Sequence, residues 1–215
     1  MPRHPTSVHP VHRVLLLLIL LTGGIVFRSP LQAQEPEPVW TAFDLETTGL
    51  RTREARIVEI GAVRFTRSAI LATTNWLVNP GIPIPPEATR IHGIRDTDVS
   101  LSPSFAGVYP HFTNFTGTTR LIAYNARYDK AILNAEIERA GLAGQPVPVD
   151  DALVLARRQL KGLPRYTLET VARHLKLDTV TYHRAQGDAF QTARIVQCLS
   201  TNQAPDSSGS ITERP

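Results

Sequence analysis

The pattern of apolar positions divides the body of the chain into a strand-rich first part and a second part that mixes helices and strands. Short apolar runs with β-branched residues occupy 39–43, 57–65 and 70–78, and turn residues separate them. Such runs predict strands, and their connections predict an antiparallel three-strand meander. A further apolar run at 121–124 predicts a fourth strand.

Apolar residues recur every three or four positions through much of the remaining chain, which predicts amphipathic helices. Helices are expected over 87–92, 104–115, 129–140, 168–175 and 184–199, and 149–160 has strand-to-helix character. Three strands followed by alternating helices and strands predict an α/β fold. In this fold a mixed sheet, made of the antiparallel meander plus parallel strands, is covered by helices.

The two ends of the chain differ from the body, 39–200. The stretch 1–38 has a basic start followed by fourteen uncharged residues at 14–27, which is the layout of a secretory signal. This apolar run is shorter than the ~17–25 residues of a membrane-spanning helix. Three interpretations remain open: a cleaved export signal, an uncleaved anchor that contacts the membrane, and a misassigned start before a cytoplasmic domain. The stretch 201–215 is polar, which predicts a disordered tail.

The composition is that of a globular protein. Hydrophobic residues make up 42% and charged residues 20% of the 215 positions, which excludes a disordered chain, a collagen and a multi-span membrane protein. The single cysteine, Cys198, excludes a disulfide framework and a structural zinc site. The formal net charge of +4 is compatible with a polyanionic partner without establishing one.

Asp44 and Glu46 stand two positions apart at the end of the first predicted strand. Because side chains alternate between the two faces of a strand, both carboxylates point to the same face. Two acids so close repel each other, and they lose hydration if that face is covered. A hard divalent cation needs such oxygen ligands on a rigid support. The alternative is a strand end whose acids are merely solvated.

Three other polar residues are candidates, although each also fits a structural role. Asp129 opens a predicted helix, where the helix dipole favours an acid. Asp188 lies near the start of the last predicted helix, beside Gly187, and could be a solvated acid. His183 precedes Asp188 by five residues, and a lone histidine is more often structural than catalytic.

Taken together, these residues resemble the DnaQ-like (DEDD) family of 3′→5′ exonucleases. The segments that carry the resemblance, in the family's order, are 43–50, 57–61, 91–94, 123–129 and 183–189. Tyr128 stands where phenylalanine is more usual. His183 stands five residues before Asp188, and Arg184 occupies the place of the tyrosine that marks the other subgroup, so the resemblance is to the DEDDh subgroup.

The resemblance implies a ribonuclease H-like fold and a metal-dependent active site. It implies two Mg²⁺ or Mn²⁺ ions bound by four acids, which here are Asp44, Glu46, Asp129 and Asp188. It also implies that His183 is the general base that takes the proton of the attacking water. Two metal ions and a base of this kind suit hydrolysis of a phosphodiester.

The resemblance also implies where the substrate binds. Thr47, Thr48 and Gly49 follow the first acids, and this loop is expected to meet the terminal nucleotide, with Leu50 packed on a base. Asn125 is expected to hold the substrate or its neighbouring loop, with structural capping as the alternative.

The resulting hypothesis is an exonuclease that releases nucleotides from the 3′ ends of single-stranded or unpaired DNA by two-metal hydrolysis. Two alternatives remain open. One is an exoribonuclease that acts on RNA ends or short oligoribonucleotides, and the other is a non-catalytic module that binds nucleic acid or a polymerase. The stretch 201–215 contains no recognisable sliding-clamp peptide, which favours a stand-alone nuclease over a polymerase subunit.

Overall fold

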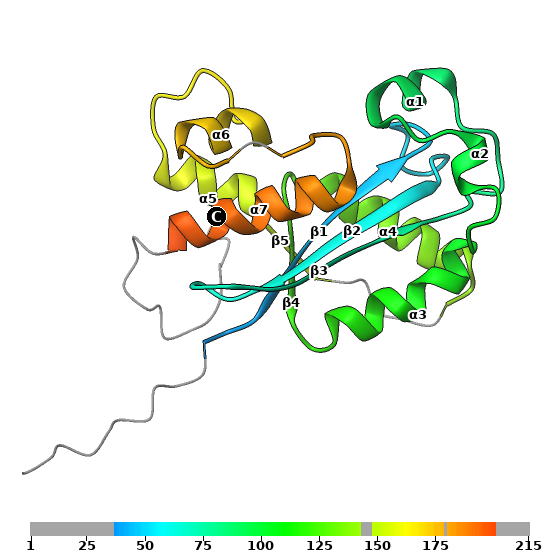
Figure 1. Ribbon diagram of the computed structural model, residues 1–215, viewed down its shortest axis with the longest axis horizontal. Coiled ribbons are helices and arrows are strands. Elements are labelled where there is room, and N and C mark those ends of the chain that lie inside the picture. The colour runs from blue at the N-terminus through cyan, green and yellow to red at the C-terminus, as the bar shows by residue number, and fades with distance from the viewer. Residues whose placement is uncertain (1–36, 143–147, 179, 201–215) are drawn as a thin grey trace, which may run out of the picture. The chain divides into compact units, whose positions relative to one another are not determined.

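The computed structural model describes residues 37–142, 148–178 and 180–200. These residues belong to one compact unit built on a five-stranded sheet of order β3-β2-β1-β4-β5 (Figure 1). The strands are β1 (Trp40–Thr47), β2 (Ile57–Phe65), β3 (Ile70–Leu77), β4 (Arg120–Ala123) and β5 (Val149–Asp151). The first three pair antiparallel, whereas β4 and β5 pair parallel. The predicted mixed sheet is therefore confirmed.

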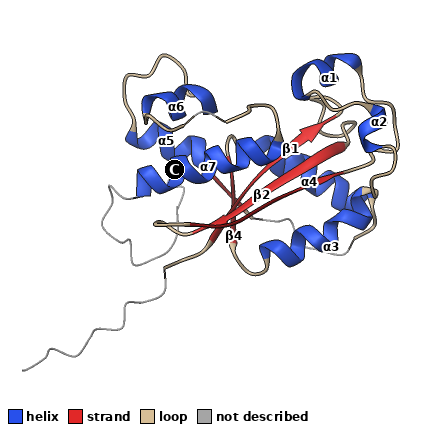
Figure 2. Ribbon diagram, in the orientation of Figure 1, coloured by secondary structure: helices blue, strands red, loops and turns tan. Residues whose placement is uncertain are grey.

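Helices cover this sheet, as Figure 2 shows. They are α1 (Pro86–His92), α2 (Asp96–Val99), α3 (Phe105–Thr116), α4 (Arg127–Arg139), α5 (Ala152–Gln159), α6 (Leu168–His174) and α7 (Ala185–Ser200). Every predicted helix is present with small shifts of its ends. The four-residue α2 was not predicted, because one turn is too short to show a helical period.

Strand β1 separates two hydrophobic cores because its side chains alternate between the faces of the sheet. Phe43 and Leu45 join the core formed with α3 and α4. Trp40 and Ala42 join the core formed with α5, α6 and α7. The same alternation places Asp44 and Glu46 on the face that α7 covers, so burial of the neighbouring apolar residues decides which way the two acids point.

A third, smaller core holds α1 and α2 against the end of β2. Val58 packs there with residues of the two helices and their flanking turns, namely Ile84, Ala88, Ile94 and Val99. This core fixes α1 beside the end of β1. The helix thereby becomes one wall of the cleft described below.

The domain boundaries at 38 and 200 stay predictions, because 1–36 and 201–215 lie outside the described residues. The same holds for the apolar segment 14–27 and for its three interpretations. Among the described residues, no helix is long and apolar enough to cross a membrane.

Candidate active site

Three acids from two elements meet on one face of the sheet. Asp44 and Glu46 project from β1, and Asp188 projects from the first turn of α7, which packs on that face. Each of the three side chains offers a carboxylate oxygen, and these oxygens lie within 4.8 Å of one another. Glu46 and Asp188 are buried, while Asp44 is half-buried. The structure therefore brings together three of the four acids named from the sequence as metal ligands.

Asp129, the fourth acid, approaches from another element. It lies in the first turn of α4 and keeps only 4% of its surface exposed. Its charge acts on Asp44, and the charge of Asp188 acts on it. Asp129 is not part of the tight group of three, but it belongs to the same electrostatic cluster.

Burial and mutual repulsion raise the pKa of every acid in this cluster. Loss of hydration is the largest cause in each case. It raises the pKa of Glu46 to about 8, that of Asp129 to about 7 and that of Asp188 to about 6. The pKa of Asp44 lies well above its usual value, because the other acids add to the effect of burial. The cluster thus needs positive charge to hold all its carboxylates ionised at neutral pH.

The residues present fit a divalent cation. The Oδ2 atom of Asp188 accepts a hydrogen bond from the backbone N–H of His183 at 3.1 Å. Its Oδ1 atom is buried and accepts no hydrogen bond from any of the described residues. A buried carboxylate oxygen without a partner costs free energy unless a ligand compensates for it. Together with the oxygens of Asp44 and Glu46, this atom forms the hard-oxygen donor set that Mg²⁺ and Mn²⁺ prefer.

His183 stands beside the cluster in a strained backbone conformation. Its φ is +59°, in the left-handed region, and its side chain is exposed. The backbone N–H of His183 contacts Asp188, and the positive charge of a protonated imidazole would lower the pKa of Asp188. The structure therefore brings the predicted base to the edge of the acid cluster.

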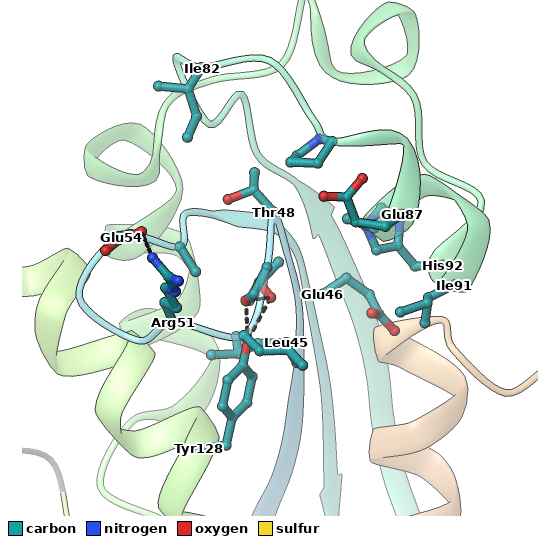
Figure 3. A pocket seen from close by; sticks show the side chains of 16 residues that line it. Leu45, Glu46, Thr48, Arg51, Glu54, Ile82, Glu87, Ile91, His92 and Tyr128 are labelled. Carbon is teal, nitrogen blue, oxygen red and sulfur yellow. Dashed lines mark hydrogen bonds and ion pairs between the residues drawn. The ribbon is translucent and has the colours of Figure 1, made fainter.

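A cleft of about 700 Å³ opens next to Glu46, between α1 and the loop that follows β1 (Figure 3). Its lining includes all four residues of 47–50 that the sequence named for nucleotide binding. Figure 3 shows Ile91 and His92 of α1 on one side and Arg51 of the loop on the other. This volume lies within the range of small-ligand sites and is large enough for a nucleotide.

Hydrogen bonds inside the loop use the two threonine hydroxyls. Thr47 Oγ1 donates to the carbonyl of Gly49 at 2.9 Å, and Thr48 Oγ1 accepts from the backbone N–H of Arg56 at 3.0 Å. The hydroxyl of Tyr128 on α4 lies 2.6 Å from the Gly49 carbonyl and 2.7 Å from Thr47 Oγ1. The contacts of Tyr128 connect the loop to α4, and those of the two threonines hold the loop that lines the cleft.

Exposed aliphatic side chains surround the cleft. Leu50 is 83% exposed, Ile91 56% and Ile82 42%. Large apolar groups held in water beside a polar cluster mark a ligand surface. The sequence named Leu50 as a base contact but gave no such role to Ile82 or Ile91, because an isoleucine in a short helix or a proline-rich loop looks like a core residue.

Asn125 does not line this cleft. Its φ is +60°, and its backbone N–H donates to Asp151 Oδ1 at 3.1 Å. Asp151 also caps α5 by accepting from the N–H of Leu153. The contacts of Asn125 thus favour the alternative of a turn residue at the end of β4, since its side chain is exposed.

Sequence reasoning missed the pair formed by Glu59 and Arg184. Glu59 is fully buried near the start of β2, and its carboxylate binds the Arg184 guanidinium with an Nη2–Oε1 distance of 2.7 Å. A signal was available, because Glu59 is the one acid inside an otherwise apolar run at 57–63. A buried charge in a central strand requires a partner.

Comparison with known proteins agrees with this site. Residues 41–196 match the family model RNase_T, described as exonuclease. The subunit epsilon of DNA polymerase III from Treponema pallidum is 38% identical over 152 residues, which are 70% of this chain and 71% of that protein. A PolC-type DNA polymerase III from Caldanaerobacter subterraneus is 35% identical over 74% of this chain, which spans 11% of that much longer protein.

Solved structures give the same picture. Exonuclease X in complex with 5′-overhanging duplex DNA is similar with a TM-score of 0.63 and 28% identity, over 75% of this chain and 91% of that one. Exonuclease I of E. coli in complex with single-stranded DNA has a TM-score of 0.66 over 78% of this chain and 41% of that one. At 18% identity, this second likeness shows the fold alone.

The family match covers most of the chain, and the epsilon relative passes 30% identity over most of its own length. The predicted ribonuclease H-like fold and the resemblance to the DnaQ-like family are both confirmed. The chain therefore belongs to the RNase T exonuclease family, within the DnaQ-like exonucleases, and is a phosphodiester hydrolase.

Proposed function

We propose that this protein is a metal-dependent 3′→5′ exonuclease that releases nucleotides from single-stranded or unpaired DNA ends. The observation that carries the proposal is the convergence of Asp44, Glu46, Asp188 and Asp129 beside a nucleotide-sized cleft. Relatives named as DNA polymerase III components, and Exonuclease X bound to duplex DNA, support DNA as the substrate.

In this proposal the four acids hold two divalent ions, Mg²⁺ or Mn²⁺. When bound, such ions lower the pKa of a water molecule and neutralise charge on the phosphate and the leaving oxygen. The protein's part is to supply a rigid set of oxygens from β1, α4 and α7. The unpartnered Oδ1 of Asp188 is the atom best placed to serve as a ligand.

His183 is the proposed general base. An imidazole nitrogen that carries no proton can accept the proton of the attacking water. Its exposed imidazole at the edge of the cluster leaves room for substrate and solvent to approach.

The cleft is the proposed site of the 3′-terminal nucleotide. In the loop at 47–50, the backbone and the side chain of Leu50 would contact the nucleotide, and Ile91 of α1 would provide a second apolar surface. An apolar side chain packed on a base is tolerant of sequence, because every base presents a similar flat face. The proposal therefore includes little preference among the four bases.

The test uses the purified full chain with 5′-labelled single strands of DNA and RNA of one sequence, in Mg²⁺, Mn²⁺ or EDTA. We expect a ladder that shortens from the 3′ end, is lost in EDTA and is blocked by a 3′-phosphate. Asp44→Asn should abolish it, whereas Asp178→Asn, an exposed acid outside the cluster, should not.

Three other results would change the proposal. Faster cleavage of the RNA strand would replace DNA with RNA as the substrate. Release of nucleotides from the 5′ end would overturn the polarity. Binding of either strand without cleavage under any metal condition would leave the non-catalytic alternative in its place.

A further inference from the structure

A fifth carboxylate, that of Glu59, lies near the four acids but is saturated by hydrogen bonds. Arg184 donates from Nη2 to Oε1 at 2.7 Å and from Nε to Oε2 at 3.1 Å. Asn75 Nδ2 donates to Oε1 at 2.9 Å, and the backbone N–H of Ala185 donates to Oε2 at 3.0 Å. Both oxygens are occupied, so Glu59 is not available as a cation ligand.

The charge state of Glu59 differs accordingly from that of the cluster. Burial raises its pKa, but the hydrogen bonds from Arg184, Ala185 and Asn75 outweigh burial and lower the pKa below its usual value. Arg184 also lowers the pKa of Glu46. Glu59 and Arg184 therefore form an ion pair next to acids that have no such partner among the described residues.

Two of the donors to Glu59 belong to the residues that directly follow His183. Hydrogen bonds from Arg184 and Ala185 connect the backbone on the C-terminal side of His183 to Glu59, near the start of β2. The backbone N–H of His183 itself is bound by Asp188. Gly61, two residues after Glu59 on the same strand face, has no space for a Cβ atom, because the backbone of Ala185 occupies that position. The backbone at the start of α7 thus packs directly against the backbone of β2.

His183 needs such support because its own conformation is unfavourable. A non-glycine residue with φ near +60° is strained and persists only when its surroundings hold it. Among the described residues, the hydrogen bonds of His183 involve its backbone alone, so its exposed side chain supplies no hydrogen bond that would hold this conformation. Its placement therefore depends on the neighbouring residues.

We propose that Glu59 and Arg184 are positioning residues, whose ion pair holds the backbone of His183 in the left-handed conformation that places its imidazole beside the acid cluster. The inference rests on the proposed function, in which His183 is the base. The two residues themselves touch neither the substrate nor the cations.

A purely structural role is the competing explanation, and a double-mutant cycle separates the two. Arg184→Met keeps the aliphatic stem but removes the donors to Glu59. A base displaced by about 1 Å can cost about 100-fold in rate. We expect kcat to fall by about 10- to 100-fold with KM within about twofold, because neither Glu59 nor Arg184 lines the nucleotide cleft. In a His183→Ala background, the same substitution should change kcat by less than about threefold, because there is no imidazole left to misplace.

Controls identify the cause. Arg184→Lys restores one donor and should recover part of the lost kcat. Glu59→Gln removes the charge at nearly constant volume and should behave like Arg184→Met. The matched control Arg173→Met breaks an exposed ion pair with Glu169 on α6 and should leave kcat unchanged.

A second measurement does not depend on activity. In EDTA, backbone hydrogen exchange in the peptide from 180 to 188 should be faster in Arg184→Met and Glu59→Gln than in the parent. The N–H groups of His183 and Ala185 in that peptide are hydrogen-bonded to Asp188 and Glu59, respectively. Exchange in a peptide from β4 should not change. Two results would overturn the inference. One is an exchange rate at 180–188 that is the same in the variants as in the parent. The other is a fall in kcat on Arg184→Met that is as large in the His183→Ala background as in the parent. An inactive parent protein would instead overturn the proposed function, and the inference with it.

Discussion

Glu46 and Glu59 are direct cross-strand partners in the antiparallel register of β1 and β2. Two like charges directly opposite each other destabilise a sheet unless one of them is paired with a counter-charge or protonated. Arg184 binds one of them and keeps it ionised, while burial and the charges of Asp188 and Glu59 raise the pKa of the other to about 8. Glu59 therefore has a structural role in its ion pair, whereas Glu46 stays available to bind a cation.

The acid cluster should make the stability of the metal-free protein fall as pH rises. In the unfolded chain these carboxyls titrate near pH 4. In the folded protein the pKa is about 6 for Asp188, about 7 for Asp129 and about 8 for Glu46. Between those values the folded protein keeps protons that the unfolded chain has released, so the free energy of unfolding decreases with pH.

The measurement is thermal unfolding in EDTA at about pH 5.5 and about pH 8, where we expect the lower melting temperature at the higher pH. Mn²⁺ or Mg²⁺ should raise the melting temperature more at the higher pH, because cations bind the ionised form. Glu46→Gln should flatten the dependence on pH. Equal melting temperatures in EDTA at both pH values would contradict this account.

Leu50 should contribute to substrate binding and not to stability. It is 83% exposed and lines the cleft, so Leu50→Ala removes apolar surface available to a base without leaving a cavity. We expect KM to rise about fivefold, from roughly 1 kcal/mol of lost contact, with kcat and the melting temperature unchanged. Leu101→Ala is the matched control, since Leu101 is 99% exposed and lies outside the cleft. Equal KM values for the two variants would remove Leu50 from the binding surface.

The hydroxyl of Tyr128 should hold the nucleotide loop. Tyr128→Phe removes one oxygen, which contacts the Gly49 carbonyl and Thr47 Oγ1. We expect the free energy of unfolding to drop by about 1 kcal/mol and KM to rise severalfold, because the loop loses its tie to α4. Steady-state kinetics and urea unfolding measure both effects.

A matched tyrosine tests the assignment. Tyr109→Phe on α3 also removes a phenolic oxygen, but that side chain packs in the core with Phe105 and lies outside the cleft. Its KM should equal that of the parent. A Tyr128→Phe variant with parental KM would show that the loop keeps its shape without this bond.

Gly61→Ala should disturb the active site from inside the sheet. A Cβ atom there overlaps the backbone of Ala185, so the start of α7 must shift away from β2, and Asp188 shifts with it. We expect a loss of about 1–3 kcal/mol in the free energy of unfolding and a large loss of kcat. Gly107→Ala on α3 meets only the Cβ of Pro103, at 3.1 Å, and should leave kcat unchanged. Parental kcat in Gly61→Ala would mean that α7 can tilt without moving Asp188.

Several features of this fold could be predicted from the local pattern of residues along the sequence. The runs at 57–65 and 70–78 predicted β2 and β3 closely, because apolar β-branched stretches between turn residues are a local signal. The period of two in β1 predicted that Asp44 and Glu46 share a face. The family motifs then named the acids Asp129 and Asp188, which spacing alone did not connect to that face.

Other features required the packed molecule. Glu59 and Arg184 are 125 positions apart, and no local pattern pairs them. The rim formed by Ile82 and Ile91 exists only because the small core under α1 brings that helix to the end of β1. Asn125 was named as a substrate contact by resemblance, whereas its position outside the cleft depends on the path of the chain between β4 and α4.

The sequence by itself determined the elements, the face of β1 that carries two acids and the family to which the chain belongs. These follow from periodicity and from short motifs, which act over a few residues. Only the tertiary structure decided that Arg184 pairs with Glu59 and not with Glu46, and that the backbone beside His183 packs on β2. Those outcomes depend on which distant groups share a buried space, since burial and nearby charge set the ionisation of a carboxylate more strongly than its neighbours along the chain.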